Sequence, residues 1–465
     1  MNRKKSEKQK SPALLLLPAV VALSWPTMLE ELMQTAVQYI DTFMVGSLGT
    51  EATASVGATT TVNWLIGSAI HALSIGFLAY ISQALGAEDV PRAKKAAAQA
   101  VFVTLVTGSL FTVLTLSLSG VIPQWMQADA EIQRTASTYF FILYLPMFFR
   151  TANIMCGTVL RAAGDTKTPM RVGIIMNLTN VVLNFFLIYP TRRVRLFSAF
   201  FTLPGAGLGV VGAAAASAVS FTLGGILIAW SLLRHPLISP RGESIRPQRD
   251  VLSDCMRVAL PNMAQRFFTS LGYVVFASAI NALGKTATAA HTVANTVESA
   301  FYIPGYGMQT AAATLTGNAV GAKERGKIKT LSRVIVTLEI AMMLVSGGLL
   351  FAFAPQMVRL FSKDPEVIRL GATVLRMVAL SEPFYGVSIV TEGMLQGAGK
   401  TVVPFIFNII CMWGVRIGGT LVCTKMCGLG LIAAWGCMIA DNLLLLVCFR
   451  IYYHKSDLLR EPEKA

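Results

Sequence analysis

The chain has 465 residues, of which 54% are hydrophobic and only 14% carry a charge. A soluble protein of this length needs more charged surface, so the composition indicates that lipid surrounds most of the chain. The formal net charge of +15 falls in short clusters between the apolar runs, a pattern that argues against nucleic acid as a partner and is typical of membrane topology signals.

Apolar runs of at least 20 residues follow one another along the whole chain, and we count twelve of them. About twenty apolar residues span the hydrocarbon core of a bilayer as a helix. Backbone amides in hydrocarbon need internal partners, and a β-barrel would instead show short alternating segments. The sequence therefore predicts an all-α integral membrane protein with twelve transmembrane helices.

The first apolar run follows a basic tail and continues from Leu14 through Trp25 without a small-residue cleavage site. We therefore interpret it as the first span rather than a signal peptide. Lys and Arg gather in the tail and the even-numbered loops, which places both termini in the cytoplasm. The clusters are Arg3, Lys4, Lys5, Lys8 and Lys10; Arg92, Lys94 and Lys95; Arg161, Lys167 and Arg171; Arg234, Arg241, Arg246 and Arg249; and Lys323, Arg325, Lys327 and Lys329. The exceptions are Arg192, Arg193 and Arg195, in a loop that this topology places outside.

A duplication organises the chain at an offset of 235 residues. The segment SLGTEATASVGATTTV from Ser47 aligns with ALGKTATAAHTVANTV from Ala282, and LRAAGDTKTP from Leu160 aligns with LQGAGKTVVP from Leu395. Near the end of each half the offset shortens to 221, because the first half has about fourteen extra residues in the loop with the three exterior arginines. Matches at a fixed offset over many positions are hard to obtain by chance.

The duplication predicts two six-helix bundles related by a pseudo-twofold axis along the membrane normal, because six helices return the chain to the same side. We predict an N-terminal bundle at residues 1–233, a cytoplasmic linker at 234–257, and a C-terminal bundle with a short cytoplasmic tail at 258–465. Rocking of one bundle against the other would open a central site to each side of the membrane in turn.

Five groups of segments carry a further signal. They are QYIDTFMVGSLG from Gln38, QALGAED from Gln83 with NAVGAKE from Asn318, LRAAGDTKTPM from Leu160, VESAFYIPGYG from Val297, and SEPFYG from Ser381 followed by LQGAGKT. At their repeat spacing these segments resemble the multidrug and toxic compound extrusion (MATE) family over nearly the whole chain. The chain is most similar to its bacterial group related to the DNA-damage-inducible efflux proteins.

The resemblance implies a V-shaped transporter of twelve helices in a bacterial cell (inner) membrane. It implies export of amphipathic, often cationic organic compounds in exchange for inward Na⁺ or H⁺, with no cofactor besides the coupling ion. The sequence does not decide between Na⁺ and H⁺ as the coupling ion. The expected partners are small organic cations and membrane lipid, and a central cavity between complete bundles permits a working monomer.

A carboxylate in the first predicted helix is the leading candidate for ion coupling. Asp41 lies about two helical turns inside the outer end of this helix, counted back from the turn at Gly46 to Gly49. A charge near the bilayer centre costs about 2.5 to 3.5 kcal/mol, so an acid there calls for a partner or a task. The carboxylate could bind Na⁺ with neighbouring oxygens or take up a proton. The structural alternative is that Asp41 caps or hydrogen-bonds a neighbouring helix.

The resemblance implies that Asp41 works with polar residues of the fifth and sixth helices, at Asn180, Asn184 and Ser217. Asn180 and Asn184 are four residues apart and share one helix face. Relatives often have aspartate where this chain has Asn184, and the amide removes a proton acceptor. This departure argues against a proton relay, whereas the carbonyl oxygens of both amides could still bind Na⁺.

The second half offers Glu298 on the eighth helix and Glu382 on the tenth. Both lie in segments with Pro and Gly, VESAFYIPGYG and SEPFYG, where helix breaks can line a cavity. We predict a second cation site or a direct contact with a cationic substrate. The structural alternative is a buried ion pair with Arg376, Arg416 or Arg266.

A multidrug cavity needs adaptable apolar surface more than fixed hydrogen bonds, and the 20 Met and 25 Phe can supply it. The candidates that lie near the acids along their helices are Tyr39, Phe43, Met44, Met147, Phe276, Tyr302, Met308 and Phe384.

Enzyme chemistry has no support in the sequence, because no Ser/His/Asp order and no metal-ligand cluster stands out. We expect no metal beyond Na⁺. The seven cysteines are scattered through apolar helices, and Cys423 with Cys427 lacks the spacing of a zinc knuckle or redox pair, so we interpret them as packing residues.

The main alternative function is a flippase of the same superfamily for a lipid-linked oligosaccharide or precursor. Such proteins commonly hold a pyrophosphate with several cationic side chains. Acids lead at the central positions of this chain, which favours organic cations instead. A passive channel would give no reason for two mobile halves or for isolated acids outside a pore ring.

Overall fold

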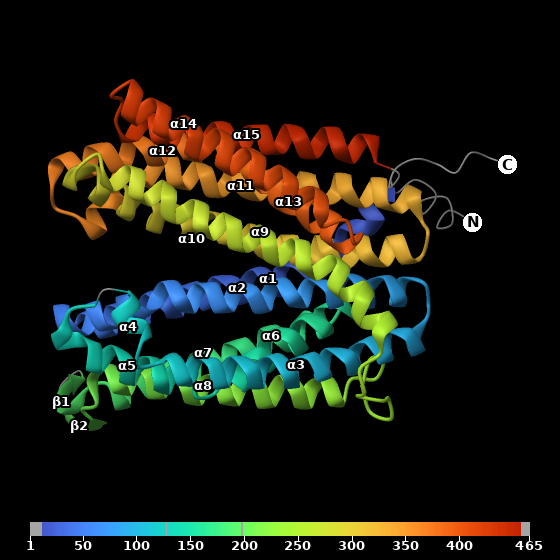
Figure 1. Cartoon of the computed structure of the whole chain (residues 1–465), viewed down its shortest axis with the longest axis horizontal. Coiled ribbons are helices and arrows are strands. Elements are labelled where there is room, and N and C mark those ends of the chain that lie inside the picture. Colours follow the sequence, from blue (N-terminus) through green and yellow to red (C-terminus); the bar gives the residue numbers. More distant parts are fainter. Residues whose placement is uncertain (1–11, 127, 197–198, 457–465) are drawn as a thin grey trace. The chain divides into compact units, whose positions relative to one another are not determined.

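The apolar runs form long helices in a computed structural model, which describes residues 12–126, 128–196 and 199–456 (Figure 1). The basic tail with Arg3, Lys4, Lys5, Lys8 and Lys10 and the predicted C-terminal tail lie outside the described residues.

The helices of the first half are α1 (Pro12–Gly46), α2 (Thr50–Gly86), α3 (Val90–Leu118), α4 (Ile122–Trp125), α5 (Ala130–Tyr144), α6 (Met147–Ala162), α7 (Lys167–Leu187) and α8 (Gly209–Leu233). Those of the second half are α9 (Arg249–Asn281), α10 (Lys285–Gly321), α11 (Arg325–Phe361), α12 (Pro365–Gly397), α13 (Val402–Ile409), α14 (Gly419–Leu421) and α15 (Leu431–Lys455), with two π-helical stretches, η2 (Ile410–Gly418) and η3 (Val422–Met426).

Nine helices of the described chain are long and apolar enough to cross a membrane, and α5 with α6 makes a tenth span with a bend of 47°. The more polar α9 and α10 have 33 and 37 residues, enough to cross at about 1.5 Å per residue. With these two helices included, the described residues contain the twelve predicted spans. The chain is a multi-pass membrane protein of the predicted all-α class.

The duplication is visible in the helix boundaries. The helices α2 and α10 begin at Thr50 and Lys285, and α3 and α11 begin at Val90 and Arg325, so both pairs are 235 residues apart. The pair α5 and α6 corresponds at the same offset to the single helix α12. Pro146 lies at the break of the first-half pair, and proline cannot donate the helical hydrogen bond. The position equivalent to Pro146 in α12 is a serine, and that helix is continuous.

A β-hairpin, which the sequence analysis did not predict, lies in one loop of this all-α fold. Strands β1 (Pro190–Leu196) and β2 (Ala199–Ala206) pair antiparallel, with Arg192 opposite Leu203 and Leu196 opposite Ala199. The hairpin occupies the loop in which the first half has its extra residues. The backbone groups outside the spans can therefore pair with each other instead of forming a helix.

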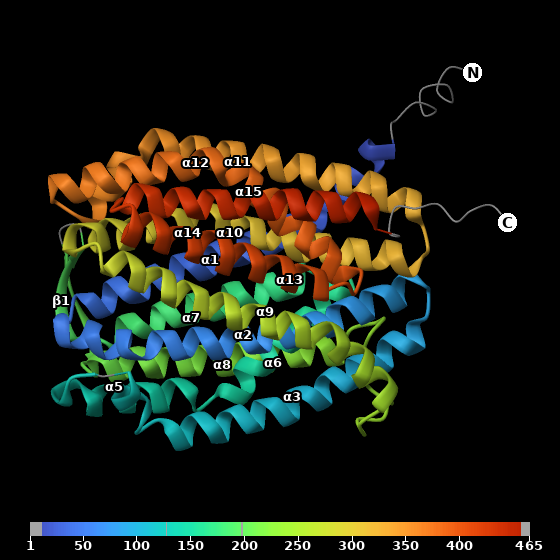
Figure 2. The same ribbon diagram turned by 45° about the horizontal axis from the view of Figure 1, so that its top comes forward.

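The described helices pack into two units. One contains α1 up to Glu31, Leu78–Asp89 and the chain from Ser253 onward; the other contains Leu32–Phe77 and Val90–Leu252. Both α1 and α2 contribute to both units, so the domain boundaries at 233 and 258 stay a prediction. Within the unit that holds most of the second half, α11, α12 and α15 lie side by side in both views (Figures 1 and 2).

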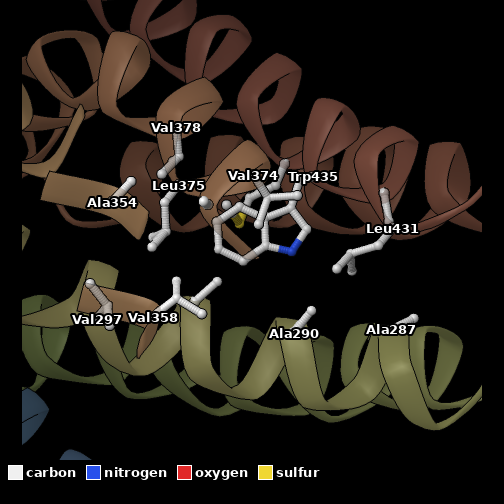
Figure 3. Close-up of a cluster of buried hydrophobic side chains, with 14 of the residues drawn as sticks. Ala287, Ala290, Val297, Ala354, Val358, Val374, Leu375, Val378, Leu431 and Trp435 are labelled. Atoms are coloured by element: carbon white, nitrogen blue, oxygen red, sulfur yellow. The ribbon is translucent and has the colours of Figure 1, made fainter. Parts of the chain in front are cut away.

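A large hydrophobic cluster holds the second-half unit together. Figure 3 shows the indole of Trp435 on α15 between side chains of α12 and the small residues Ala287 and Ala290 of α10. These alanines are three residues apart, on one helix face, and their size lets the large ring approach α10. The indole N–H donates to Nδ1 of His291 at 3.3 Å, which satisfies the buried polar atom.

Two glycines at equivalent positions allow α2 and α10 to cross closely. A Cβ added to Gly86 would overlap the carbonyl oxygen of Asn318, and one added to Gly321 would overlap that of Gln83. Both helices end at these glycines. The left-handed turn residues, however, are Glu88 and Lys323, with φ of 59° and 57°. The two glycines are therefore required for helix packing, not for the turns.

Replacing Gly321 by alanine is expected to destabilise the protein by about 1 to 3 kcal/mol, because the new methyl group must push two backbones apart. Thermal unfolding of the detergent-purified protein measures this effect. The control is Gly348→Ala in α11, where an added Cβ meets no atom within 4 Å. Equal unfolding temperatures for the two variants would contradict the close crossing.

Candidate functional site

The first-half candidates come together around Asp41. Nδ2 of Asn184 donates to Oδ1 of Asp41. With the Asn180 amide oriented to satisfy both of its ends, its nitrogen donates to the same oxygen at 2.9 Å and its oxygen accepts from the Ser217 hydroxyl at 3.1 Å. The four predicted residues thus form one hydrogen-bonded group from α1, α7 and α8.

Small residues bring these helices close to one another. Gly212 of α8 packs directly on the Leu187 carbonyl at the end of α7. The α8 stretch that precedes Ser217 is rich in alanine, and Asn180 and Asn184 lie on the buried face of α7. The carboxylate is therefore held by neutral amide donors, which can stabilise its charge without cancelling it.

One atom of this group has no partner. Oδ1 of Asn184 is buried and accepts no hydrogen bond within the described part of the chain. The amide nitrogen of the same side chain donates to the Asp41 carboxylate, so this oxygen lies close to the carboxylate. Carboxylate and amide oxygens are the ligands that hard cations prefer.

The second-half candidates belong to a larger acidic cluster. Glu298 of α10, Glu339 of α11 and Glu382 of α12 are only 6%, 0% and 1% exposed. Glu298 and Glu339 are close enough to Glu382 for their negative charges to repel a negative charge on it. Neither carboxylate oxygen of Glu339 or of Glu382 has a hydrogen-bond partner among the described residues. We call Glu298, Glu339 and Glu382 the acidic cluster.

Two glycines of the sequence motifs make room for the central acid. A Cβ on Gly305 or on Gly386 would come within 2.9 Å or 2.8 Å of Oε1 of Glu339. Real Cβ atoms do not approach other atoms so closely. The glycines of VESAFYIPGYG and SEPFYG therefore enclose a carboxylate that α11 supplies.

Sequence reasoning missed Glu339. Its segment VTLEIAMML has no Pro or Gly, and the equivalent first-half residue is Thr104, so neither the motifs nor the duplication pointed to it. The cost of a lone acid in an apolar span, which identified Asp41, would have found it.

The buried ion pair of the second half is elsewhere. Arg416 bonds to Asp441 with Nε to Oδ2 at 2.8 Å and donates to Asn442 at 3.1 Å. Its charge also acts on Glu298. In the described chain neither Glu298 nor Glu382 forms an ion pair with any of the three predicted arginines.

Three tyrosines lie beside the acidic cluster. The ring of Tyr302 is 5.9 Å from that of Tyr306 and 5.6 Å from that of Tyr385, both edge-on, and the charges of Glu298 and Glu382 act on Tyr302. Aromatic faces and carboxylates both attract organic cations. Of the three, only Tyr302 was predicted.

The eight predicted cavity residues divide into two groups. Four are buried in packed hydrophobic clusters and have no face left for a ligand in this structure: Met44, Met147, Phe276 and Met308. Their apolar side chains pack between helices in these clusters. The other four keep exposed surface: Tyr39, Phe43, Tyr302 and Phe384.

Comparison with known proteins gives the family context. The MatE family model matches residues 26–186 and 261–422, two stretches that begin 235 residues apart. The probable multidrug resistance protein NorM of Thermotoga maritima is 27% identical over 422 residues, which cover 91% of this chain and 89% of that protein.

Solved structures show the same fold. A MOP superfamily transporter from Pyrococcus furiosus, whose binding pocket of reverse polarity is said to suggest a different function, is 25% identical with a TM-score of 0.88 over 98% of this chain and 100% of that one. A MATE crystal structure in complex with MaD3S has a TM-score of 0.87 at 24% identity, over 96% of this chain and 98% of that one.

Replacing Glu339 by methionine is expected to stabilise the protein by about 1 to 3 kcal/mol, because an apolar side chain of similar volume removes a buried carboxyl without partners. The unfolding temperature of the purified protein tests this. Glu366→Met is the matched control, since Glu366 is exposed and paired only with Arg369. A lower unfolding temperature for Glu339→Met would show that partners stabilise the acid.

Proposed function

Since the chain belongs to the MatE family of transporters, which are not enzymes, we propose that it is a cation-coupled multidrug efflux antiporter. It exports amphipathic organic cations and takes in Na⁺ or H⁺ by alternating access. The observation that carries the proposal is the acidic cluster next to three tyrosines: its three carboxylates are buried, and those of Glu339 and Glu382 have no hydrogen-bond partner among the described residues. Negative charge and aromatic faces together suit an organic cation.

Asp41 is the proposed coupling carboxylate. Its partners are the amides of Asn180 and Asn184, and Asn180 is bonded in turn to Ser217. The unpartnered Oδ1 of Asn184 offers a second oxygen for Na⁺. A proton could instead bind the carboxylate alone. An inward gradient of either ion would then be coupled to export through the occupancy of one group.

Glu298 and Glu382 are the proposed second site, for a cation or for the substrate itself. Glu339 extends this site, because its charge acts on Glu382 and its oxygens have no partner among the described residues. Tyr302 and the exposed Phe384 of the same unit provide aromatic surface. Tyr39 and Phe43 provide such surface in the other unit.

We also propose a bacterial cell (inner) membrane as the location, with both termini in the cytoplasm. In the second-half unit, the connections after α10 and α12 lie at one end, and those after α9, α11 and η3 lie at the other (Figure 1). Lys323, Arg325 and Lys327 follow α10, so the positive-inside rule assigns that end to the cytoplasm. The working unit is a monomer in lipid, with no cofactor other than the coupling ion.

A lipid-linked flippase fits the partners of two arginines in the spans less well. Arg150 donates to Asn63 at 2.6 Å and lies over the ring of Phe221, and Arg416 is bonded to Asp441. These guanidinium groups are already engaged by the protein, whereas a pyrophosphate needs available donors.

Export of an ethidium-like cation from reconstituted vesicles tests the proposal. An imposed Na⁺ gradient and then a pH gradient alone are applied in separate experiments. Export driven by one of the gradients is expected and names the coupling ion. No gradient-dependent movement across a panel of organic cations would contradict the antiporter and favour the flippase.

The variant Asp41→Asn is expected to abolish gradient-driven export, because an amide neither binds a proton at neutral pH nor gives Na⁺ a charged ligand. The loss should exceed about tenfold, with unchanged insertion and unfolding temperature. Glu51→Gln is the control, because Glu51 is an exposed acid in the first turn of α2. Gradient-driven export that survives in Asp41→Asn would remove this residue from the mechanism.

The variants Glu298→Gln and Glu382→Gln are expected to separate substrate binding from ion coupling. A loss of ethidium affinity with normal ion-driven exchange marks the altered acid as a substrate contact. A loss of exchange with normal affinity marks it as an ion ligand. Wild-type affinity and exchange in both variants would show that these acids have a structural role only.

A further inference from the structure

Two cysteines on neighbouring helices face each other near one end of the second-half unit. The sulfur atoms of Cys423 on η3 and Cys437 on α15 are 3.9 Å apart. Both side chains are partly exposed. Cys427, the nearest cysteine to Cys423 in the sequence, is exposed, and the sulfur close to Cys423 is that of Cys437.

The surroundings of the pair leave room for a bond. Gly419, one turn before Cys423, has no side chain, and a Cβ there would come within 3.1 Å of the Cys437 sulfur. The glycine therefore leaves space for this sulfur against helix residues 419–426. A bond between the two thiols requires the sulfurs to approach by a further two ångströms or so, to about 2.05 Å. Both cysteines lie near the loop ends of their spans, the side from which an oxidant in solution would approach.

The position along the helices places the pair close to the membrane surface. Cys423 is three residues before the end of η3 at Met426, and Cys437 is six residues after the start of α15 at Leu431. At about 1.5 Å per residue both sulfurs are within roughly 10 Å of the connecting loop. This inference rests on the proposed orientation, in which that loop lies on the side of the membrane opposite the cytoplasm. On that side thiols are readily oxidised.

We propose that Cys423 and Cys437 form a disulfide that joins η3 to α15. The reaction is thiol–disulfide exchange with an oxidised small thiol. The thiolate of one cysteine attacks the oxidant's S–S bond and releases one thiol, and the second cysteine then attacks the mixed disulfide and releases the other. The protein loses two hydrogens and two electrons, and the oxidant gains both as two thiols.

The bond would restrain a segment that the helix backbone holds weakly. The stretches η2 and η3 are π-helical. Such turns are rare in proteins as a whole, and where they occur they are often at functional sites. Thr424, next to Cys423, also lines a pocket of about 470 Å³ together with Thr286, Leu429 and Leu431. The disulfide therefore fixes one wall of this pocket relative to α15.

A second thiol pair on the same two helices provides an internal control. Cys411 of η2 and Cys448 of α15 are joined by a side-chain hydrogen bond. Cys411 is only 1% exposed, so an oxidant in solution cannot reach it. The proposal concerns only Cys423 and Cys437, the pair nearer the connecting loop.

The test counts free thiols in the full-length protein. Cells are treated with N-ethylmaleimide before lysis, the protein is treated again after denaturation to reach buried thiols, and the product is analysed by mass and peptide mapping. The expected result is two unmodified cysteines in a linked Cys423–Cys437 peptide. In detergent, oxidised glutathione should form the same link and raise the unfolding temperature by a few degrees, and a reductant should reverse both effects.

The variants Cys423→Ser and Cys437→Ser should each abolish the link and the thermal shift, whereas Cys411→Ser should keep both. Seven alkylated cysteines in cells, or a link that maps to Cys427, would overturn the proposal. A link that forms in detergent but not in cells would also overturn the proposal, because the pair would then not lie on the oxidising side of the membrane. The vesicle transport assay is independent of this link, so its result judges the proposed function separately.

Discussion

Burial of charge in a low-dielectric interior is the constraint on which the structure depends. Two cations of the spans have polar partners: Arg416 bonds to Asp441, and Arg150 bonds to Asn63. Two buried acids differ from these cations, since the carboxylates of Glu339 and Glu382 have no hydrogen-bond partner among the described residues. Unpartnered carboxylates are costly, and a protein that keeps them in one cluster gains a site that only a cation or protons can complete.

The duplicated framework explains where such a site can form. Equivalent helices begin at the same offset, and equivalent glycines at Gly86 and Gly321 set the crossing of α2 and α10. The halves differ in their buried polar residues. Asp41 is held by amides in one half, whereas the other half has glutamates on α10, α11 and α12, and its continuous α12 replaces a broken pair.

The sequence predicted the helices and the duplication well, because span length and fixed-offset matches are local signals. It also predicted the partners of Asp41, by resemblance. It missed Glu339 and the β-hairpin, and half of the predicted cavity residues, such as Met147, are packed in a core. A side chain's burial depends on which helix faces it, and the 3.6-residue period is uninformative when all faces are apolar.

The most direct measurement of the central claim is equilibrium binding of an ethidium-like cation to the purified protein, followed by fluorescence, while Na⁺ or protons are titrated. If buried acids bind both substrate and coupling ion, one of these ions should displace the dye or lower its affinity by about tenfold, which corresponds to about 1.4 kcal/mol of coupling. Dye affinity that neither ion changes, together with tight binding of a pyrophosphate lipid, would contradict the account.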